Sequence, residues 1–167
     1  MKEDKNESRW DKLLNIRTMG RDDTHADQYR YPYEPTPYSV LERLANSGYI
    51  RKGNTLIDYG CGKGRVDSEM ILANAEQFEV PEGADRMYFF NPFSVEILRK
   101  VMARILESYY AYPRKIQLFF YYPSDEYISY LMTVEEVMFA DEIICMDLFP
   151  GEDPREKIAI FELGYAE

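Results

Sequence analysis

The pattern of apolar and polar positions predicts an alternation of helices and strands along most of the chain. Short, nearly continuous apolar runs are typical of buried strands, whereas apolar residues that recur every three or four positions indicate one face of a helix. On this basis we expect five strands, at residues 55–59, 86–90, 115–122, 142–149 and 157–163. Helices are expected near 8–17, at 37–48 and 65–79, and in the stretches that begin at Ser94 and Ser124.

Residues with strong end preferences place several of these helix boundaries. Thr36 is the expected N-cap of the second helix, with Pro37 at its first position and Gly48 as the residue that ends it. Thr133 and Glu136 have the spacing of a capping box, which predicts a further helical turn there.

The alternation of helices and strands predicts an α/β fold, a Rossmann-like and mostly parallel sheet with helices on both faces. The last two strands are joined by the short polar link 150–154, which indicates an antiparallel pair at the C-terminal edge. We expect residues 1–30 to be a polar N-terminal segment and residues 31–167 to form a single domain. The proline- and tyrosine-rich stretch 29–38 is an extended arm, which either packs on the domain or covers a ligand.

Composition and charge narrow the class of partner. The net charge is −10 with a pI of about 4.7, so nucleic acid is an unlikely partner and a local basic patch would be needed to bind it. No apolar run reaches the ~20 residues of a membrane span, so no membrane contact is expected. Cys61 and Cys145 make no metal-ligand spacing, and the charged start lacks a secretory signal, so we expect a cytoplasmic protein with reduced thiols and no metal. His25, the only histidine, lies in a polar stretch and is expected to be exposed.

The glycine-rich turn after the first predicted strand carries the most chemical information. Glycines at 60, 62 and 64 let a ligand approach the backbone, and their amides can face an anionic group. The turn lies at the carboxyl end of a predicted parallel strand, where ligands bind in open α/β sheets. The dinucleotide fingerprint fails because residue 65 is arginine, and the phosphate loop fails because residue 64 is glycine.

The stretch from Leu56 to Val66 resembles the first motif of the class I S-adenosylmethionine-dependent methyltransferases. The resemblance implies S-adenosylmethionine as the cofactor, bound by Asp58, Gly60, Cys61, Gly62 and Gly64. The segment 71–76 is similar to the part of that family that contacts adenine, which implies a cofactor contact from Asn74. The arm that ends at Tyr38 occupies the place of the family's segment that covers the cofactor, so Tyr38 is a further candidate.

The stretch from Phe89 to Phe93 is similar to the family's fourth motif, at the end of the neighbouring strand. In relatives that methylate amino groups, the asparagine and the following carbonyl hold the target nitrogen and the aromatic packs on it. The resemblance therefore implies catalytic roles for Asn91, Pro92 and Phe93, in an acceptor site for a small molecule or a protein. Phe93 stands where a second proline is usual, so the class of acceptor stays open. A strand end followed by a helix cap is the alternative interpretation.

The spacing of the two motifs implies an abridged methyltransferase fold. Only 30 residues lie between Gly60 and Asn91, too few for the family's second strand, whose acidic end binds the ribose hydroxyls. We expect a shortened sheet of about five strands, with an order near 1-2-3-5-4. Two hypotheses follow, methyl transfer to an unidentified acceptor, or a non-catalytic relative that serves as a binding or structural module. Binding of another nucleotide through the same turn is the least favoured third hypothesis.

Overall fold

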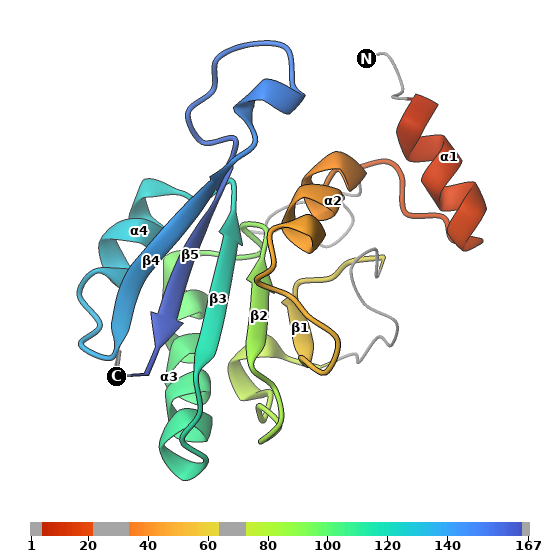
Figure 1. The fold of residues 1–167 in the computed structure, drawn as a ribbon. Helices are drawn as coiled ribbons and strands as arrows, with labels where there is room; N and C mark the ends of the chain where they lie inside the picture. Colours follow the sequence, from red (N-terminus) through yellow and green to blue (C-terminus); the bar gives the residue numbers. More distant parts are fainter. Residues whose placement is uncertain (1–4, 22–33, 64–72, 165–167) are drawn as a thin grey trace.

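The computed structural model describes residues 5–21, 34–63 and 73–164, which form an α/β fold with a five-stranded mixed sheet (Figure 1). The strands are β1 (Leu56–Tyr59), β2 (Arg86–Phe89), β3 (Ile116–Tyr121), β4 (Val137–Ile144) and β5 (Lys157–Leu163). The α-helices are α1 (Lys5–Leu14), α2 (Tyr38–Asn46), α3 (Val95–Ala111) and α4 (Asp125–Leu131). Two short 3₁₀ helices, η1 (Ala75–Gln77) and η2 (Met146–Leu148), complete the described elements.

The strand order is β1-β2-β3-β5-β4, which confirms the order expected from the sequence. β1, β2 and β3 pair in parallel, whereas β5 is antiparallel to both β3 and β4. The antiparallel C-terminal pair is therefore confirmed. The sheet is mixed rather than mostly parallel, because β5 inserts between β3 and β4 and makes two of the four pairings antiparallel.

One face of the sheet is covered by α3 and α4, behind the sheet in Figure 1. The expected stripe of α3 is confirmed, because Leu98, Met102 and Ile105 are fully buried against the strands. All six residues of β3 are buried, as its continuous apolar run predicts for a strand covered on both faces. Ser124 caps α4 as expected, since its side chain accepts a hydrogen bond from the Tyr127 amide.

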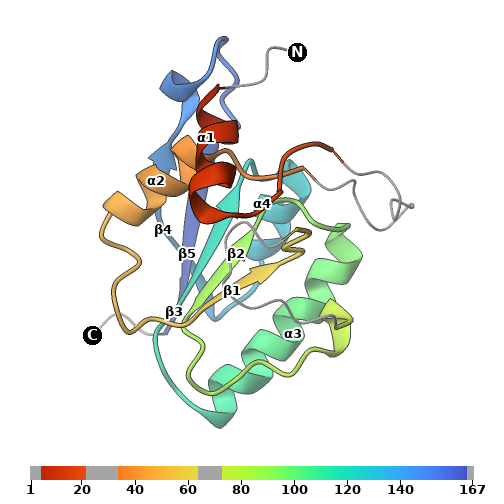
Figure 2. The same cartoon turned by 90° about the vertical axis from the view of Figure 1, so that its right-hand side faces the viewer.

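The opposite face is covered by α2, whose Val40 and Leu44 pack with Tyr88 and Phe119 of the sheet. Figure 2 shows α1 beside α2, across the sheet from α3. The expected cap at Thr36 is wrong. Pro37 occupies the N-cap position without a side-chain hydrogen bond.

The Thr36 hydroxyl has another role, because it lies 3.0 Å from the Tyr88 hydroxyl inside the core. The Tyr88 side chain is completely buried, and a buried phenol needs a polar partner of this kind. The hydroxyl of Thr36 is therefore used by the tertiary structure rather than by the helix end.

Two predictions in the C-terminal half need correction. β4 begins at Val137 and ends at Ile144, five residues earlier than the strand expected at 142–149, and η2 follows it. β4 is an edge strand with mostly exposed residues, and its register shifts between Phe139 and Asp141, so it lacks the regular apolar alternation that reveals a strand. A turn does follow Thr133, since the Val137 amide donates to the Val134 carbonyl, but the expected capping box is wrong: the Thr133 hydroxyl and amide both donate to the Tyr130 carbonyl at the end of α4.

The helix expected at 65–79 is also wrong in its described part. Residues 75–77 form only the short η1, and the chain is extended at Phe78. Residues 64–72 lie outside the described part of the chain, and so do His25 and residues 29–33 of the arm 29–38.

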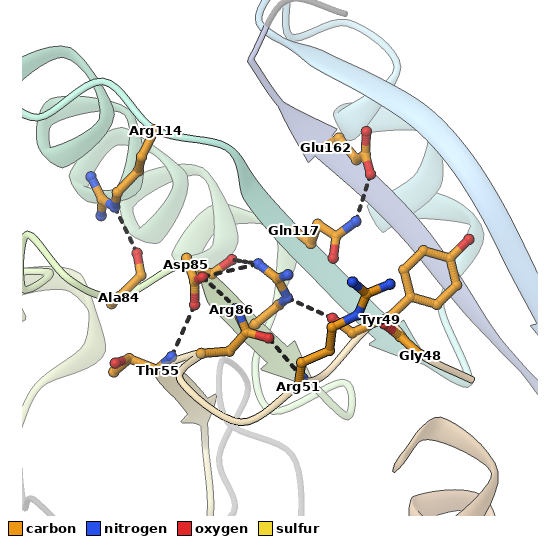
Figure 3. A network of polar contacts seen from close by, with 11 residues as sticks. Gly48, Tyr49, Arg51, Thr55, Ala84, Asp85, Arg86, Arg114, Gln117 and Glu162 are labelled. Carbon is orange, nitrogen blue, oxygen red and sulfur yellow. Dashed lines mark hydrogen bonds and ion pairs between the residues drawn. The ribbon is translucent and has the colours of Figure 1, made fainter. Parts of the chain in front are cut away.

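A polar network ties the loops at the amino end of the sheet together (Figure 3). The Asp85 carboxylate accepts hydrogen bonds from the Thr55 amide, at 2.9 Å, and from the Asn54 side chain, at 2.7 Å. Arg86 donates to the Tyr49 carbonyl, and Gln117 donates to Glu162 at 2.6 Å. These bonds fix the entry to β1 and β2, so the carboxyl ends of both strands are held in register.

Candidate functional site

The turns after β1 and β2 touch each other at the carboxyl end of the sheet. Gly60, at φ +79°, follows β1, and Pro92 follows β2. A Cβ atom built on Gly60 would lie 2.3 Å from the Cβ of Pro92, which is closer than any side chain tolerates. Glycine at 60 is therefore required for two reasons, the positive φ and the packing of Pro92 against the backbone. Gly62, with φ +53°, continues the turn in the same left-handed region.

The side-chain amide of Asn91 makes a hydrogen bond through its nitrogen but none through its oxygen within the described residues. Its Nδ2 donates to the Tyr122 carbonyl at 2.5 Å, just past the end of β3. Both residues have positive φ, +38° at Asn91 and +51° at Tyr122, and asparagine tolerates this conformation better than most residues. The Oδ1 of Asn91 is shielded from solvent and has no hydrogen-bond partner in the part of the chain that the structure describes. Its amide thus has a fixed orientation and a spare acceptor.

Pro92 and Phe93, the two other candidates for the acceptor site, lie in different environments. Pro92 is half-buried against the Gly60 turn. Phe93 is buried in the core, where its ring meets the edge of Phe89 at 6.4 Å and its carbonyl accepts a hydrogen bond from Tyr127. The structure therefore brings Asn91 and Pro92 to the turn, and places the Phe93 ring under the sheet.

Asp58 lies in β1 directly beside Tyr88 of β2, on the face that α2 covers. Complete burial holds the pKa of Tyr88 well above its usual value, the hydrogen bond to Thr36 opposes this, and the charge of Asp58 raises the pKa further. The phenol is therefore neutral beside the half-buried Asp58. Cys61, also half-buried, follows Gly60 in the turn, and Gly64 lies outside the described residues.

Asn74 and Tyr38, the two remaining cofactor candidates, both have structural contacts. Asn74 is exposed and caps η1, with its Oδ1 accepting from the Glu76 amide at 3.1 Å. Tyr38 is buried between α1 and α2, where its hydroxyl donates to Asp11 at 2.7 Å and its ring stacks on Trp10 at 5.8 Å. Their contacts with a cofactor stay predictions.

Sequence reasoning missed a carboxylate that organises the N-terminal segment. Asp11 accepts hydrogen bonds from the amide and hydroxyl of Thr18, at 2.8 and 2.6 Å, and from the Met19 amide at 3.2 Å, besides the one from Tyr38. Burial raises the pKa of Asp11, but the bonds from Thr18, Tyr38 and Met19 outweigh it and leave the pKa below its usual value. The Met19 carbonyl in turn accepts from Nζ of Lys63, in the glycine turn, at 3.2 Å. A lone aspartate near the end of a polar helix gives no sequence signal for such a role.

The arrangement fits one end of S-adenosylmethionine better than the other. The open backbone at Gly60 and Gly62 suits the methionyl group, whose carboxylate can receive amide hydrogen bonds. The ribose needs a carboxylate at the end of a strand beside β1, but β1 is the edge of the sheet formed by residues 5–21, 34–63 and 73–164. The fit is therefore partial.

Within the described residues, no three histidine, cysteine, aspartate or glutamate side chains gather in a way that could hold a metal ion. No described helix is long and apolar enough to cross a membrane.

Comparison of the chain with models of protein families, with curated proteins and with solved structures gave no match. The two touching turns are therefore the feature of the described residues that points to a function.

Proposed function

We propose that this chain transfers a methyl group from S-adenosylmethionine to an acceptor nitrogen at the carboxyl end of β1 and β2. The observation that carries the proposal is the contact between Gly60 and Pro92, because Pro92 directly follows Asn91 and Gly60 belongs to the turn that resembles a cofactor site. The bound cofactor would supply an already activated methyl group: the acceptor nitrogen's lone pair would form the N–C bond as the S–C bond breaks, with S-adenosylhomocysteine as the leaving group and the surplus proton released to solvent. The protein therefore has to bind and align rather than provide a strong base.

The residues of the site have separate parts in this proposal. The backbone around Gly60 and Gly62 leaves room for the methionyl group and offers amide donors. Asn91, oriented by the Tyr122 carbonyl, would accept a hydrogen bond from the acceptor N–H through Oδ1. Since Oδ1 is shielded from solvent, the acceptor reaches it after neighbouring groups shift, and the bond then forms in a site with little water.

The net charge and the two cysteines bear on the class of methyl acceptor and on the cellular compartment. With a net charge of −10, the protein repels polyanions, so a small molecule or a protein is a better acceptor than nucleic acid. Cys61 and Cys145 form no disulfide, which supports a reducing compartment such as the cytoplasm.

A second candidate function is a non-catalytic module that keeps the fold as a binding or structural unit. The position of β1 at the edge of the described sheet favours it, because no strand beside β1 offers a carboxylate to the ribose there. Losing such a charge-assisted pair costs about 2–3 kcal/mol, or tens- to hundredsfold in affinity. Cofactor binding separates the two candidates.

Gly62→Val is expected to weaken binding of S-adenosylmethionine by about 100-fold or more, because a branched side chain would fill the space of the methionyl group. The measurement is titration calorimetry of both proteins. Valine at φ +53° also strains the backbone, so a matched control is needed.

Gly53→Val provides that control. Gly53 also has a positive φ, +101°, but it precedes β1 at the other end of the strand and a Cβ there would meet nothing within 4 Å. The Gly53→Val variant should be less stable than the wild type and should bind the cofactor with the same affinity. If Gly62→Val binds S-adenosylmethionine as tightly as the wild type does, the glycine turn is not part of the cofactor site.

Asn91→Gly is expected to leave cofactor affinity nearly unchanged and to reduce methyl transfer by about 100-fold or more, because the acceptor nitrogen loses its alignment. Glycine keeps the φ of +38° without strain, which Asn91→Ala does not. Transfer of labelled methyl groups to a panel of amines measures the effect. If Asn91→Gly turns over as the wild type does, Asn91 only ends the strand.

A further inference from the structure

The N-terminal helix is attached to the domain through polar contacts around one tyrosine. The Tyr38 amide donates to Glu7 at 2.8 Å, its hydroxyl donates to Asp11 at 2.7 Å, and its ring stacks on Trp10. The apolar side chains at the end of α1 contribute little, since Leu13 is 70% exposed and Leu14 is 49% exposed. A segment held in this way has few buried apolar contacts and can open without the rest of the fold.

Asp11 links this attachment to the segment that follows α1. Its carboxylate binds the amide and hydroxyl of Thr18 and the amide of Met19, and Thr18 is 1% exposed. The Asp11 carbonyl also accepts from the Ile16 amide at 2.9 Å. One side chain therefore fixes both the position of α1 on Tyr38 and the fold of the chain that leaves α1.

The same segment reaches the glycine turn. The Met19 carbonyl accepts from Nζ of Lys63 at 3.2 Å, and Lys63 follows Gly62 directly. A continuous path of hydrogen bonds thus runs from Tyr38 through Asp11 and Met19 to Lys63. The path joins α2 to the candidate ligand turn from outside the sheet.

We propose that residues 5–19 act as a strap that holds the glycine turn, with Asp11 as its fastening. When the strap is fastened, the turn has fewer conformations, and a ligand that needs the ordered turn binds more tightly. Strap closure and ligand binding are then reciprocal, since each favours the other by the same factor. The coupling between α1 and the turn does not depend on which ligand the turn takes, so it can be tested without a cofactor.

The test is hydrogen exchange in the full chain with the Asp11→Asn substitution, read together with the emission of Trp10, the only tryptophan. Asparagine has one acceptor oxygen instead of two and no charge, so it cannot accept all four hydrogen bonds of Asp11 and the fastening is weakened. Trp10 emission is expected to shift to longer wavelength, and exchange of the Gly62 and Lys63 amides to rise about fivefold or more, with β3 unchanged. Release of Trp10 with unchanged exchange at the turn would overturn the proposal.

Lys63→Met tests the other end of the strap, and Lys52→Met, in the exposed loop before β1, is its control. Lys63→Met is expected to raise exchange at the turn, and the double variant with Asp11→Asn to exchange no faster than Asp11→Asn alone, because both act through one path. Additive effects would mean two independent contacts and no strap. If Asp11→Asn unfolds the chain, seen as lost protection in β3, Lys63→Met decides alone, and an unchanged turn then contradicts the proposal.

Discussion

Gly60→Ala is expected to destabilise the folded protein by about 2–5 kcal/mol. A residue with a Cβ at φ +79° costs about 1–2 kcal/mol, and crowding in a packed region typically costs about 1–3 kcal/mol more. The added Cβ would lie 2.3 Å from the Pro92 Cβ, and neither atom is at the end of a flexible side chain that could turn away. Urea denaturation of both proteins measures the difference in free energy of unfolding.

Gly53→Ala separates the clash from the backbone strain. Gly53 also requires a positive φ, but a Cβ there has open space, so only the cost of about 1–2 kcal/mol is expected. The excess loss in Gly60→Ala then measures the contact between the two turns. Equal losses in both variants would mean that Pro92 does not press on the turn, and the geometry of the candidate site would be wrong.

Phe120→Ala is expected to destabilise the protein by about 3–5 kcal/mol, the usual range for removing a buried phenylalanine. Phe120 is 1% exposed and ends a stack of three rings that crosses the parallel strands. Phe120 lies 4.6 Å from Phe89, and Phe89 lies 4.9 Å from Tyr59, with nearly parallel planes. The cavity would open in the layer between the sheet and α3, where surrounding residues are already close-packed.

Phe139→Ala is the matched control for this substitution. Phe139 also contacts an aromatic core residue, Phe161, at 5.6 Å, but it is 51% exposed at the edge of the sheet. Its loss should cost about 1 kcal/mol, because exposed side chains bury less area and leave no cavity. Thermal unfolding of both variants measures the difference. If the aromatic stack stabilises the core, Phe120→Ala melts at a much lower temperature than Phe139→Ala.

The topology could be predicted because it depends on features that are local in sequence. β3 is apolar without interruption and proved to be buried throughout, and α3 carries an apolar stripe with the period of a helix. The polar stretch 150–154 pointed to an antiparallel pair, and β4 and β5 do pair in this way, although the connection between them also contains η2. Once the parallel strands were recognised, the meeting of the turns at Gly60 and Asn91 followed from the common direction of β1 and β2.

The errors arose where a residue's partner is distant in sequence. Thr36 has the local pattern of a helix cap, but its hydroxyl lies beside that of Tyr88, 52 positions away. β4 was placed too late because an exposed edge strand needs no apolar alternation. Residues 75–77 had good helix propensity, yet they form a single 3₁₀ turn that packs on α3. In each case, tertiary contacts override the local preference.

The sequence could predict where the candidate site lies but not how its residues are arranged. The glycines and Asn91 could be assigned from their motifs, but the positive φ of Tyr122 and its bond to Asn91 have no signature in the sequence. The same holds for Asp11, whose four acceptor contacts come from residues 18, 19 and 38.

Methyl transfer requires that the chain bind S-adenosylmethionine, which titration calorimetry with S-adenosylmethionine and S-adenosylhomocysteine measures; two temperatures prevent a small heat from being mistaken for no binding. We expect a dissociation constant of about 1–100 μM for both ligands, and the loss of affinity in Gly62→Val described above. Such binding would require an anchor for the ribose other than a strand beside β1, and it would justify a search for the methyl acceptor. No binding at about 1 mM ligand, in protein shown by its cooperative unfolding to be folded, would contradict methyl transfer and favour the non-catalytic module.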